Sequence, residues 1–167
     1  VTLDEVERKL SSEDLMICND EEPMCIAGVF GGISSGVTQK TKNIFIESAY
    51  FDAPTIRKTS KRHGLQTDAS FRFERGADPE ITIYALKRAT MLIKEIAGGQ
   101  VSSQIVDEYP QGHNPIKVTI SYENIYKITG TRIPESSVKK ILELLEFKLL
   151  DEEEGSLILE VPAYRVD

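Results

Sequence analysis

Short runs of branched and aromatic residues alternate with polar or glycine-rich stretches over the first fifty positions of the chain. Runs of this length and composition, bounded by turn-forming residues, are typical of β-strands. The pattern predicts strands over 14–19, 24–30 and 43–51. Both faces of the third run are largely apolar.

One helix is indicated by its end signals as well as by its periodicity. Asp78 can cap it, and Pro79 suits its first position. Apolar residues then recur at helical spacing from Ile81 to Ile96, and the pattern stops at Gly98. We therefore expect a helix over 81–96, followed by a strand over 101–108.

The last fifty or so residues repeat this logic on a smaller scale. A strand over 116–120 is expected to lead into a short helix that Ser121 caps and that ends near Gly130. Pro134 is expected in the first turn of another helix. That helix has an apolar stripe, formed by Val138, Ile141, Leu142 and Leu145. The acidic run 151–154, with Gly155, is interpreted as the solvated tip of a hairpin.

Turn-forming residues at 109–115 (YPQGHNP) separate the two periodic regions. We place a domain boundary there, with one domain over 1–112 and a second over 113–167. The predicted fold class is α+β: a mixed or antiparallel sheet with packed helices, followed by a small winged-helix-like α+β unit.

Composition narrows the classes of function. With 40% hydrophobic and 28% charged residues the chain is expected to fold as a globular protein, and its net charge of −7 opposes non-specific attraction to nucleic acid or anionic membrane. No apolar run approaches the roughly 20 residues that cross a bilayer, and the first residues lack the order of a signal peptide. We expect a soluble, cytoplasmic protein without a membrane partner. Because the sequence begins without methionine and ends in an apparent strand, we also expect an excised fragment.

Several common chemistries find little support. GGISSG at 31–36 lacks the lysine and the following helix of a phosphate-binding loop, so a tight connection between strands is favoured. His63 and His113 lie in no nucleophile–base motif, and together with Cys18 and Cys25 they lack metal-ligand spacing. We assign no catalytic residue and no metal site, and expect both cysteines to be reduced.

Glu47 places a carboxylate in the middle of an apolar run. Burying it without a partner is expensive. Either an arginine, Arg72 or Arg75, neutralises it as a structural ion pair, or it stands at a pocket wall to meet a ligand.

The stretch after Glu47 offers two further candidate features. Arg57, Lys58, Lys61 and Arg62 form a basic cluster that suits phosphate backbones or is simply a solvated helix face. In the segment TDAS, Thr67 and Ala69 point the same way if the backbone is extended. Alternatively, Asp68 or Ser70 caps a following turn.

Three motifs in this order, GVFGGISSGV, NIFIESAYFDAPTIRKTSKRHGLQTDAS and RFERGADP, resemble the bacterial phenylalanyl-tRNA synthetase beta subunit. The resemblance implies that 1–112 is the C-terminal part of the B3/B4 editing domain and 113–167 the start of B5. In that family the B3/B4 domain hydrolyses tyrosine wrongly esterified to phenylalanine tRNA. The implied partners are this tRNA and an alpha subunit that carries aminoacylation, in a heterotetramer of two alpha and two beta subunits. ATP and Mg²⁺ are implied for the full synthetase, and no cofactor for this chain.

Residue by residue, the resemblance places the family's editing pocket on Gly31, Glu47, Thr67 and Ala69. Glu47 would receive the tyrosine hydroxyl and Ala69 would leave room for the ring. The family's histidine and arginine lie further upstream than this sequence reaches, so the isolated chain is expected to be inactive. Phe71 stands where some relatives have histidine. The alternative is a non-catalytic module that supports the synthetase and contacts tRNA.

Overall fold

The computed structural model describes residues 1–110 and 112–166. The chain divides into two compact units, one formed by 1–107 with Val166 and one over 108–165. The boundary expected between 112 and 113 lies a few residues further along, and as a domain boundary it stays a prediction. Both units combine helices with a small antiparallel sheet, which confirms the α+β class.

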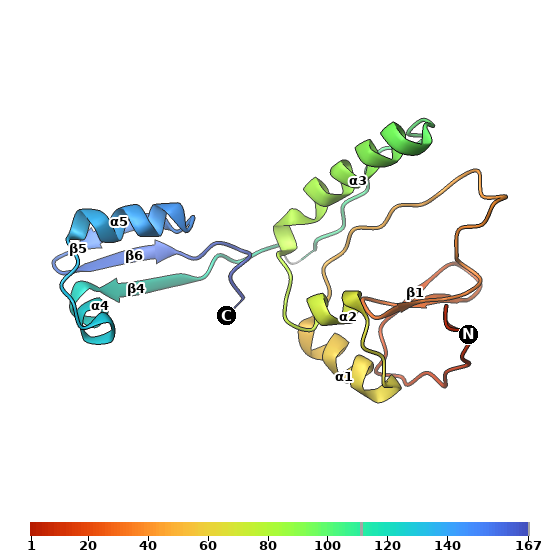
Figure 1. The fold of residues 1–167 in the computed structure, drawn as a ribbon, viewed down its shortest axis with the longest axis horizontal. Coiled ribbons are helices and arrows are strands. Elements are labelled where there is room, and N and C mark those ends of the chain that lie inside the picture. The colour runs from red at the N-terminus through yellow and green to blue at the C-terminus, as the bar shows by residue number, and fades with distance from the viewer. Residues whose placement is uncertain (111, 167) are drawn as a thin grey trace. The chain divides into compact units, whose positions relative to one another are not determined.

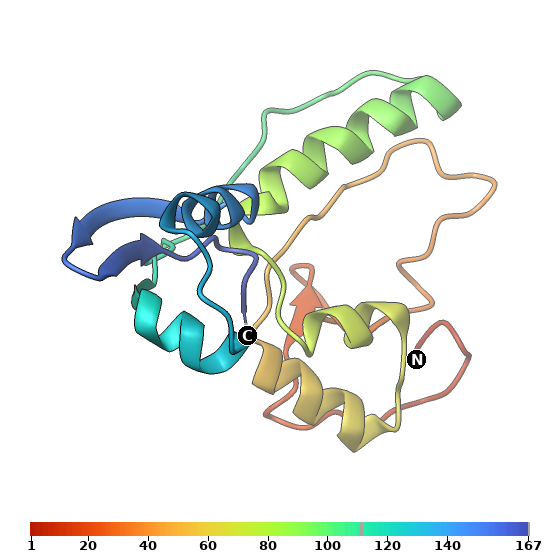
Figure 2. The same cartoon turned by 60° about the vertical axis from the view of Figure 1, so that its left-hand side comes forward.

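The first unit contains a three-stranded antiparallel sheet in the order β1-β2-β3, followed by helices (Figure 1). Both views show α1 and α2 beside each other (Figure 2). Its elements in chain order are β1 Met16–Cys18, β2 Pro23–Ile26, β3 Phe30–Gly31, α1 Ala53–His63, α2 Asp68–Phe73, the 3-10 turn η1 Pro79–Ile81 and α3 Thr82–Ala97.

The strand predicted over 24–30 is two strands joined by a tight turn. Gly28 takes a positive φ of 65°, and the amide of Val29 donates to the carbonyl of Ile26 at 3.0 Å. A left-handed backbone at Gly28 breaks the ladder, because an extended strand cannot contain it. The turn brings Val29 into a buried cluster with Ile26, Ile56 and Leu65.

The strand predicted over 43–51 is wrong. This segment is irregular and belongs to a long connection between β3 and α1, drawn in orange in Figure 1. No described strand pairs with it. Phe45 is 96% exposed, although Phe51 at the end of the run packs edge-on against Phe73 with ring centroids 5.0 Å apart. An apolar run without a neighbouring backbone edge lacks the hydrogen-bond partners that make a strand.

The predicted helix over 81–96 is confirmed as α3. Asp78 accepts a hydrogen bond from the amide of Glu80 at 2.9 Å, and Pro79 opens the turn η1 that leads into the helix. None of the residues of α3 is buried, so its apolar stripe faces solvent. The strand expected over 101–108 is wrong, since the segment is irregular and Val106 is 80% exposed.

The second unit has the predicted order of strand, two helices and hairpin. Ser121 caps α4 by accepting from the amide of Asn124 at 3.2 Å, and Gly130 ends that helix. The sheet is antiparallel in the order β4-β6-β5. Its elements are β4 Lys117–Ser121, α4 Tyr122–Thr129, α5 Glu135–Leu144, β5 Lys148–Glu153 and β6 Ser156–Glu160.

Two details of this unit differ from expectation. Pro134 stands just before the first turn of α5 rather than in it, and the first three acidic residues, 151–153, belong to β5 instead of the hairpin tip. The apolar stripe of α5 is only partly covered. Val138 is buried with Leu157 and Leu159, whereas Ile141 is 48% exposed.

The close packing around Gly32 gives our first prediction. A Cβ atom at position 32 would lie 2.0 Å from the carbonyl oxygen of Met24, so Gly32→Ala must shift the backbone of β2 or β3. We expect a loss of about 1–3 kcal/mol or more, and a melting temperature lower by about 5 °C or more in circular dichroism. Gly36→Ala is the matched control, because its Cβ would approach nothing closer than 3.4 Å. Equal melting temperatures for the two variants would contradict this account.

Candidate functional site

An open hollow of about 590 Å³ lies on the first unit. Its walls come from β1 and β2, from the turn and strand over 28–31, from the irregular segment over 47–49 and from the start of α2. The four residues that the sequence singled out for a pocket, Gly31, Glu47, Thr67 and Ala69, all line it. Residues far apart in the chain are therefore brought to one concave surface.

Glu47 reaches this hollow without a protein partner. It makes no hydrogen bond or ion pair with any residue that the structure describes, and partial desolvation raises the pKa of its carboxyl group. The ion pair with Arg72 or Arg75 that we considered does not form. Arg75 instead pairs with Glu74 at 2.8 Å and lies over the ring of Phe71. Of the two alternatives for Glu47, the structural ion pair is excluded for the described residues.

Cys25 shares the wall with Glu47. Burial raises the pKa of its thiol, and the negative charge of Glu47 raises it further. Cys18 and Cys25 are both free thiols, in line with the expectation that they are reduced. The hollow therefore presents a neutral thiol beside a carboxyl group, and sequence reasoning gave no signal for this neighbour.

Thr67 is the N-cap of α2, so the extended conformation considered for TDAS is wrong. Its hydroxyl accepts from the amide of Ser70 at 3.0 Å, and Ser70 Oγ accepts from the amide of Thr67 at 2.9 Å. The same hydroxyl donates to the carbonyl of Val29 at 2.6 Å. With its proton used and one lone pair occupied, this hydroxyl retains a single lone pair for any ligand or water.

Gly31 also lines the hollow, and the N-terminal segment contacts it. The amide of Leu3 donates to the carbonyl of Gly31 at 3.0 Å. A Cβ at position 31 would lie 2.9 Å from Leu3 Cδ1. The absence of a side chain at Gly31 thus lets the N-terminal segment approach the back of the hollow.

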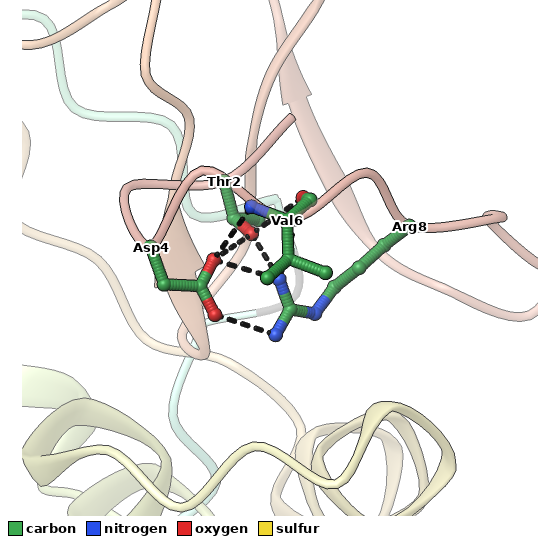
Figure 3. A network of polar contacts seen from close by, with 4 residues as sticks. All are labelled: Thr2, Asp4, Val6 and Arg8. Atoms are coloured by element: carbon green, nitrogen blue, oxygen red, sulfur yellow. Dashed lines mark hydrogen bonds and ion pairs between the residues drawn. The ribbon is translucent and has the colours of Figure 1, made fainter.

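A polar network holds this N-terminal segment in place (Figure 3). The guanidinium of Arg8 donates to both carboxylate oxygens of Asp4, at 2.8 and 2.7 Å, and also to the hydroxyl of Thr2. The hydrogen bond from Arg8 holds the pKa of Asp4 well below its usual range. Sequence reasoning missed this pair, because i, i+4 spacing indicates a contact on a helix and residues 4–8 are not helical.

The basic cluster on α1 is partly used inside the protein. Arg57 donates to the carbonyl of Glu74 at 2.8 Å, and Arg62 pairs with Glu13 and Asp14. Lys58 and Lys61 remain exposed. Two of the four residues whose charges suit a phosphate backbone are therefore committed to intramolecular bonds.

The partner of Arg62, Asp14, has a fully buried carboxylate that also lies 2.7 Å from Nε2 of His63. Desolvation alone would raise the pKa of Asp14, but hydrogen bonds from the amide of Ser11, from His63 and from Arg62 outweigh it and hold the pKa below its ordinary value. Arg62 thus acts as an anchor between α1 and the segment before β1.

Phe71 and Asp68 differ from each other in their relation to the hollow. Phe71 is 57% exposed and does not line the hollow. Asp68, which we considered only as a cap, does line it. The signal for Asp68 was its place between Thr67 and Ala69.

The described residues offer no group of three or more histidine, cysteine, aspartate or glutamate side chains that could hold a metal ion. Nor is any helix in the described ranges long and apolar enough to cross a membrane.

Comparison with known proteins matches both units to named families. The B3/4 domain model matches residues 1–98, and the tRNA synthetase B5 domain model matches 118–167. The whole chain is 55% identical to the phenylalanine–tRNA ligase beta subunit of Bacteroides fragilis (strain YCH46), 52% to that of Porphyromonas gingivalis (strain W83) and 44% to that of Geobacillus kaustophilus (strain HTA426). It spans 20%, 20% and 21% of these relatives, about a fifth of their length.

The buried carboxylate of Asp14, which lies outside the hollow, gives a testable prediction. Asp14→Asn should destabilise the chain by about 2–3 kcal/mol near neutral pH, because it removes the charge that offsets Arg62. Since the pKa of Asp14 is lowered in the folded state, its contribution is full above the ordinary carboxyl pKa and is lost as pH falls through the lowered value. Denaturant unfolding of wild type and variant should therefore give a stability gap that is constant around neutrality and narrows in acid.

Asp20→Asn is the control for this measurement, because Asp20 is exposed and its side chain makes no described hydrogen bond or ion pair. A gap for Asp14→Asn that widens in acid would contradict the assignment.

Proposed function

Because the chain belongs to the B3/4 domain family and continues into a tRNA synthetase B5 domain, we propose that its hollow is part of an editing site. The chain corresponds to a piece of a phenylalanine–tRNA ligase beta subunit. The proposed substrate is tyrosine wrongly esterified to phenylalanine tRNA. The proposed reaction is hydrolysis of that ester.

The need for such a site follows from the chemistry of selection. An apolar pocket shaped for phenylalanine discriminates against a ligand that merely adds a hydroxyl by only about 100-fold. A second site that prefers the hydroxylated amino acid corrects the remaining errors. That second site must offer a polar group at the place where the hydroxyl arrives.

Glu47 carries the proposal, as an unpaired carboxylate on the wall of the hollow with its pKa raised by desolvation. A tyrosine hydroxyl would donate to this carboxylate and satisfy it. Phenylalanine would cover the same group without a hydrogen bond, at a cost of about 1–3 kcal/mol. The preference is therefore for tyrosine.

The hydrolysis itself needs no protein nucleophile. A water oxygen attacks the ester carbonyl carbon, the bond from that carbon to the ribose oxygen breaks, and the ribose oxygen takes up a proton. We assign the general base to no residue. Thr67 has one lone pair free to orient the water, and the adjacent ribose hydroxyl of the tRNA assists by its position.

The proposed setting is a cytoplasmic ligase of two alpha and two beta subunits. The resemblance to the family implies that the alpha subunit would hold the aminoacylation site with its ATP and Mg²⁺. Lys58 and Lys61 are the members of the basic cluster whose side chains are left for the phosphates of tRNA.

A non-catalytic module that supports the ligase is the second candidate. It is favoured by the structural use of Thr67, Arg57 and Arg62, each of which bonds within the chain. Deacylation of mischarged tRNA by the intact ligase separates the two functions, since a supporting module has no such activity.

Glu47→Ala in the intact ligase should lower kcat/KM for hydrolysis of Tyr-tRNA by about 10-fold or more, because the hydroxyl loses its charged acceptor. Aminoacylation with phenylalanine should be unchanged. Glu22→Ala is the matched control, because Glu22 is an exposed acid outside the hollow. Unchanged hydrolysis in Glu47→Ala would refute the role of this carboxylate.

The substitution Ala69→Trp tests whether the substrate ring occupies the hollow. The indole should occupy room that the substrate ring needs, so hydrolysis of Tyr-tRNA should fall sharply while aminoacylation is retained. Both rates are measured on the same preparation. Retained hydrolysis would place the substrate elsewhere, and loss of both activities together with a lower melting temperature would indicate misfolding.

A further inference from the structure

The hollow contains a second carboxylate, Asp68, that the editing proposal does not use. Asp68 is the first residue of α2, is exposed and lines the hollow together with Ala69. It makes no side-chain hydrogen bond or ion pair with any residue in 1–110 or 112–166. We propose that Asp68 binds the α-ammonium group of the esterified amino acid, a step that rests on the proposed function.

The local structure does not require this acid. The start of α2 is already closed by the reciprocal bonds of Thr67 and Ser70, so the capping position is filled without Asp68. A carboxylate in the first turn gains a little from the helix dipole, but that gain needs no hollow beside it. The side chain is thus available to a ligand.

The charge of the hollow favours a cation. Its lining residues include two acids, Glu47 and Asp68, and no lysine, arginine or histidine of the described chain. The two acids come from different segments, the irregular connection before α1 and the start of α2. They therefore offer two separate acceptors on one concave surface.

An aminoacyl ester presents two polar donors at opposite ends, the side-chain hydroxyl and the α-ammonium group. Its carboxyl group is esterified, so the amino acid end of the substrate carries a positive charge rather than the balanced charges of a free amino acid. Both acids are exposed residues. Partial desolvation raises the pKa of the Glu47 carboxyl group, which suits a neutral hydroxyl donor. The carboxylate of Asp68 is left for the ammonium, and a charged pair at the solvent edge avoids a large desolvation penalty.

The test removes, in turn, the negative charge of Asp68 and the positive charge of the substrate's α-ammonium group. Intact ligase is prepared with the native beta subunit, with Asp68→Asn and with Glu80→Gln, a charge-matched control whose exposed side chain lies outside the hollow. The substrates are Tyr-tRNA and its deaminated counterpart, in which an α-hydroxyl replaces the α-ammonium. Each variant's kcat/KM is divided by the wild-type value for the same substrate, so the intrinsic reactivity of the two esters cancels.

We expect Asp68→Asn to lower kcat/KM for Tyr-tRNA by about fivefold or more and to change that for the deaminated ester by less than about twofold. Glu80→Gln should leave both values within about twofold. An equal loss on both substrates would overturn the ammonium contact and leave Asp68 with a structural role, as would no loss on either.

This outcome is distinguishable from failure of the editing proposal itself. If the wild-type ligase hydrolyses neither ester, the proposed function falls, and the contact of Asp68 falls with it. If the wild type hydrolyses Tyr-tRNA and Glu47→Ala is impaired while Asp68→Asn is not, editing stands and only the ammonium contact is refuted.

Discussion

The hydrogen bond from the hydroxyl of Thr67 to the carbonyl of Val29 is the interaction on which the hollow depends. It joins the start of α2 to the turn between β2 and β3, two places 38 residues apart in sequence. The same hydroxyl caps α2, so a substitution that removes it loses both the contact and the cap. One side chain thereby fixes the wall that carries Ala69 against the wall that carries Gly31.

Much of the second unit followed from its sequence, because its signals are local. Its helices are set by residues close together in sequence: the cap Ser121, the terminating Gly130 and the periodic apolar residues of α5. The first unit was harder. The run that includes Phe45 has strand composition, but a strand also needs a partner edge, which composition does not reveal. The tight turn at Gly28 was missed because the residues on both sides of it are apolar, so the composition shows no break in the strand.

For the site, resemblance pointed to four residues that the structure brings together, while the residue pattern predicted some wrong geometry. Gly31, Glu47, Thr67 and Ala69 do meet at one hollow, yet Thr67 does so as a helix cap and Glu47 from an irregular segment. Neither Cys25 nor the Asp4–Arg8 pair was identified in advance. The contact of Cys25 with Glu47 joins segments 22 residues apart, and the Asp4–Arg8 pair forms in an irregular segment whose path no local pattern predicts.

Gly28 belongs both to the hollow and to the packing beneath it. A Cβ atom there would lie 2.8 Å from Phe51 and 2.9 Å from Ile56, and its φ of 65° already disfavours any other residue. A substitution at Gly28 would therefore disturb both the packing beneath the hollow and the shape of its wall. A redesign of the hollow would therefore keep Gly28 and vary positions 48, 49 and 69, which line the hollow and where the backbone carries no left-handed glycine.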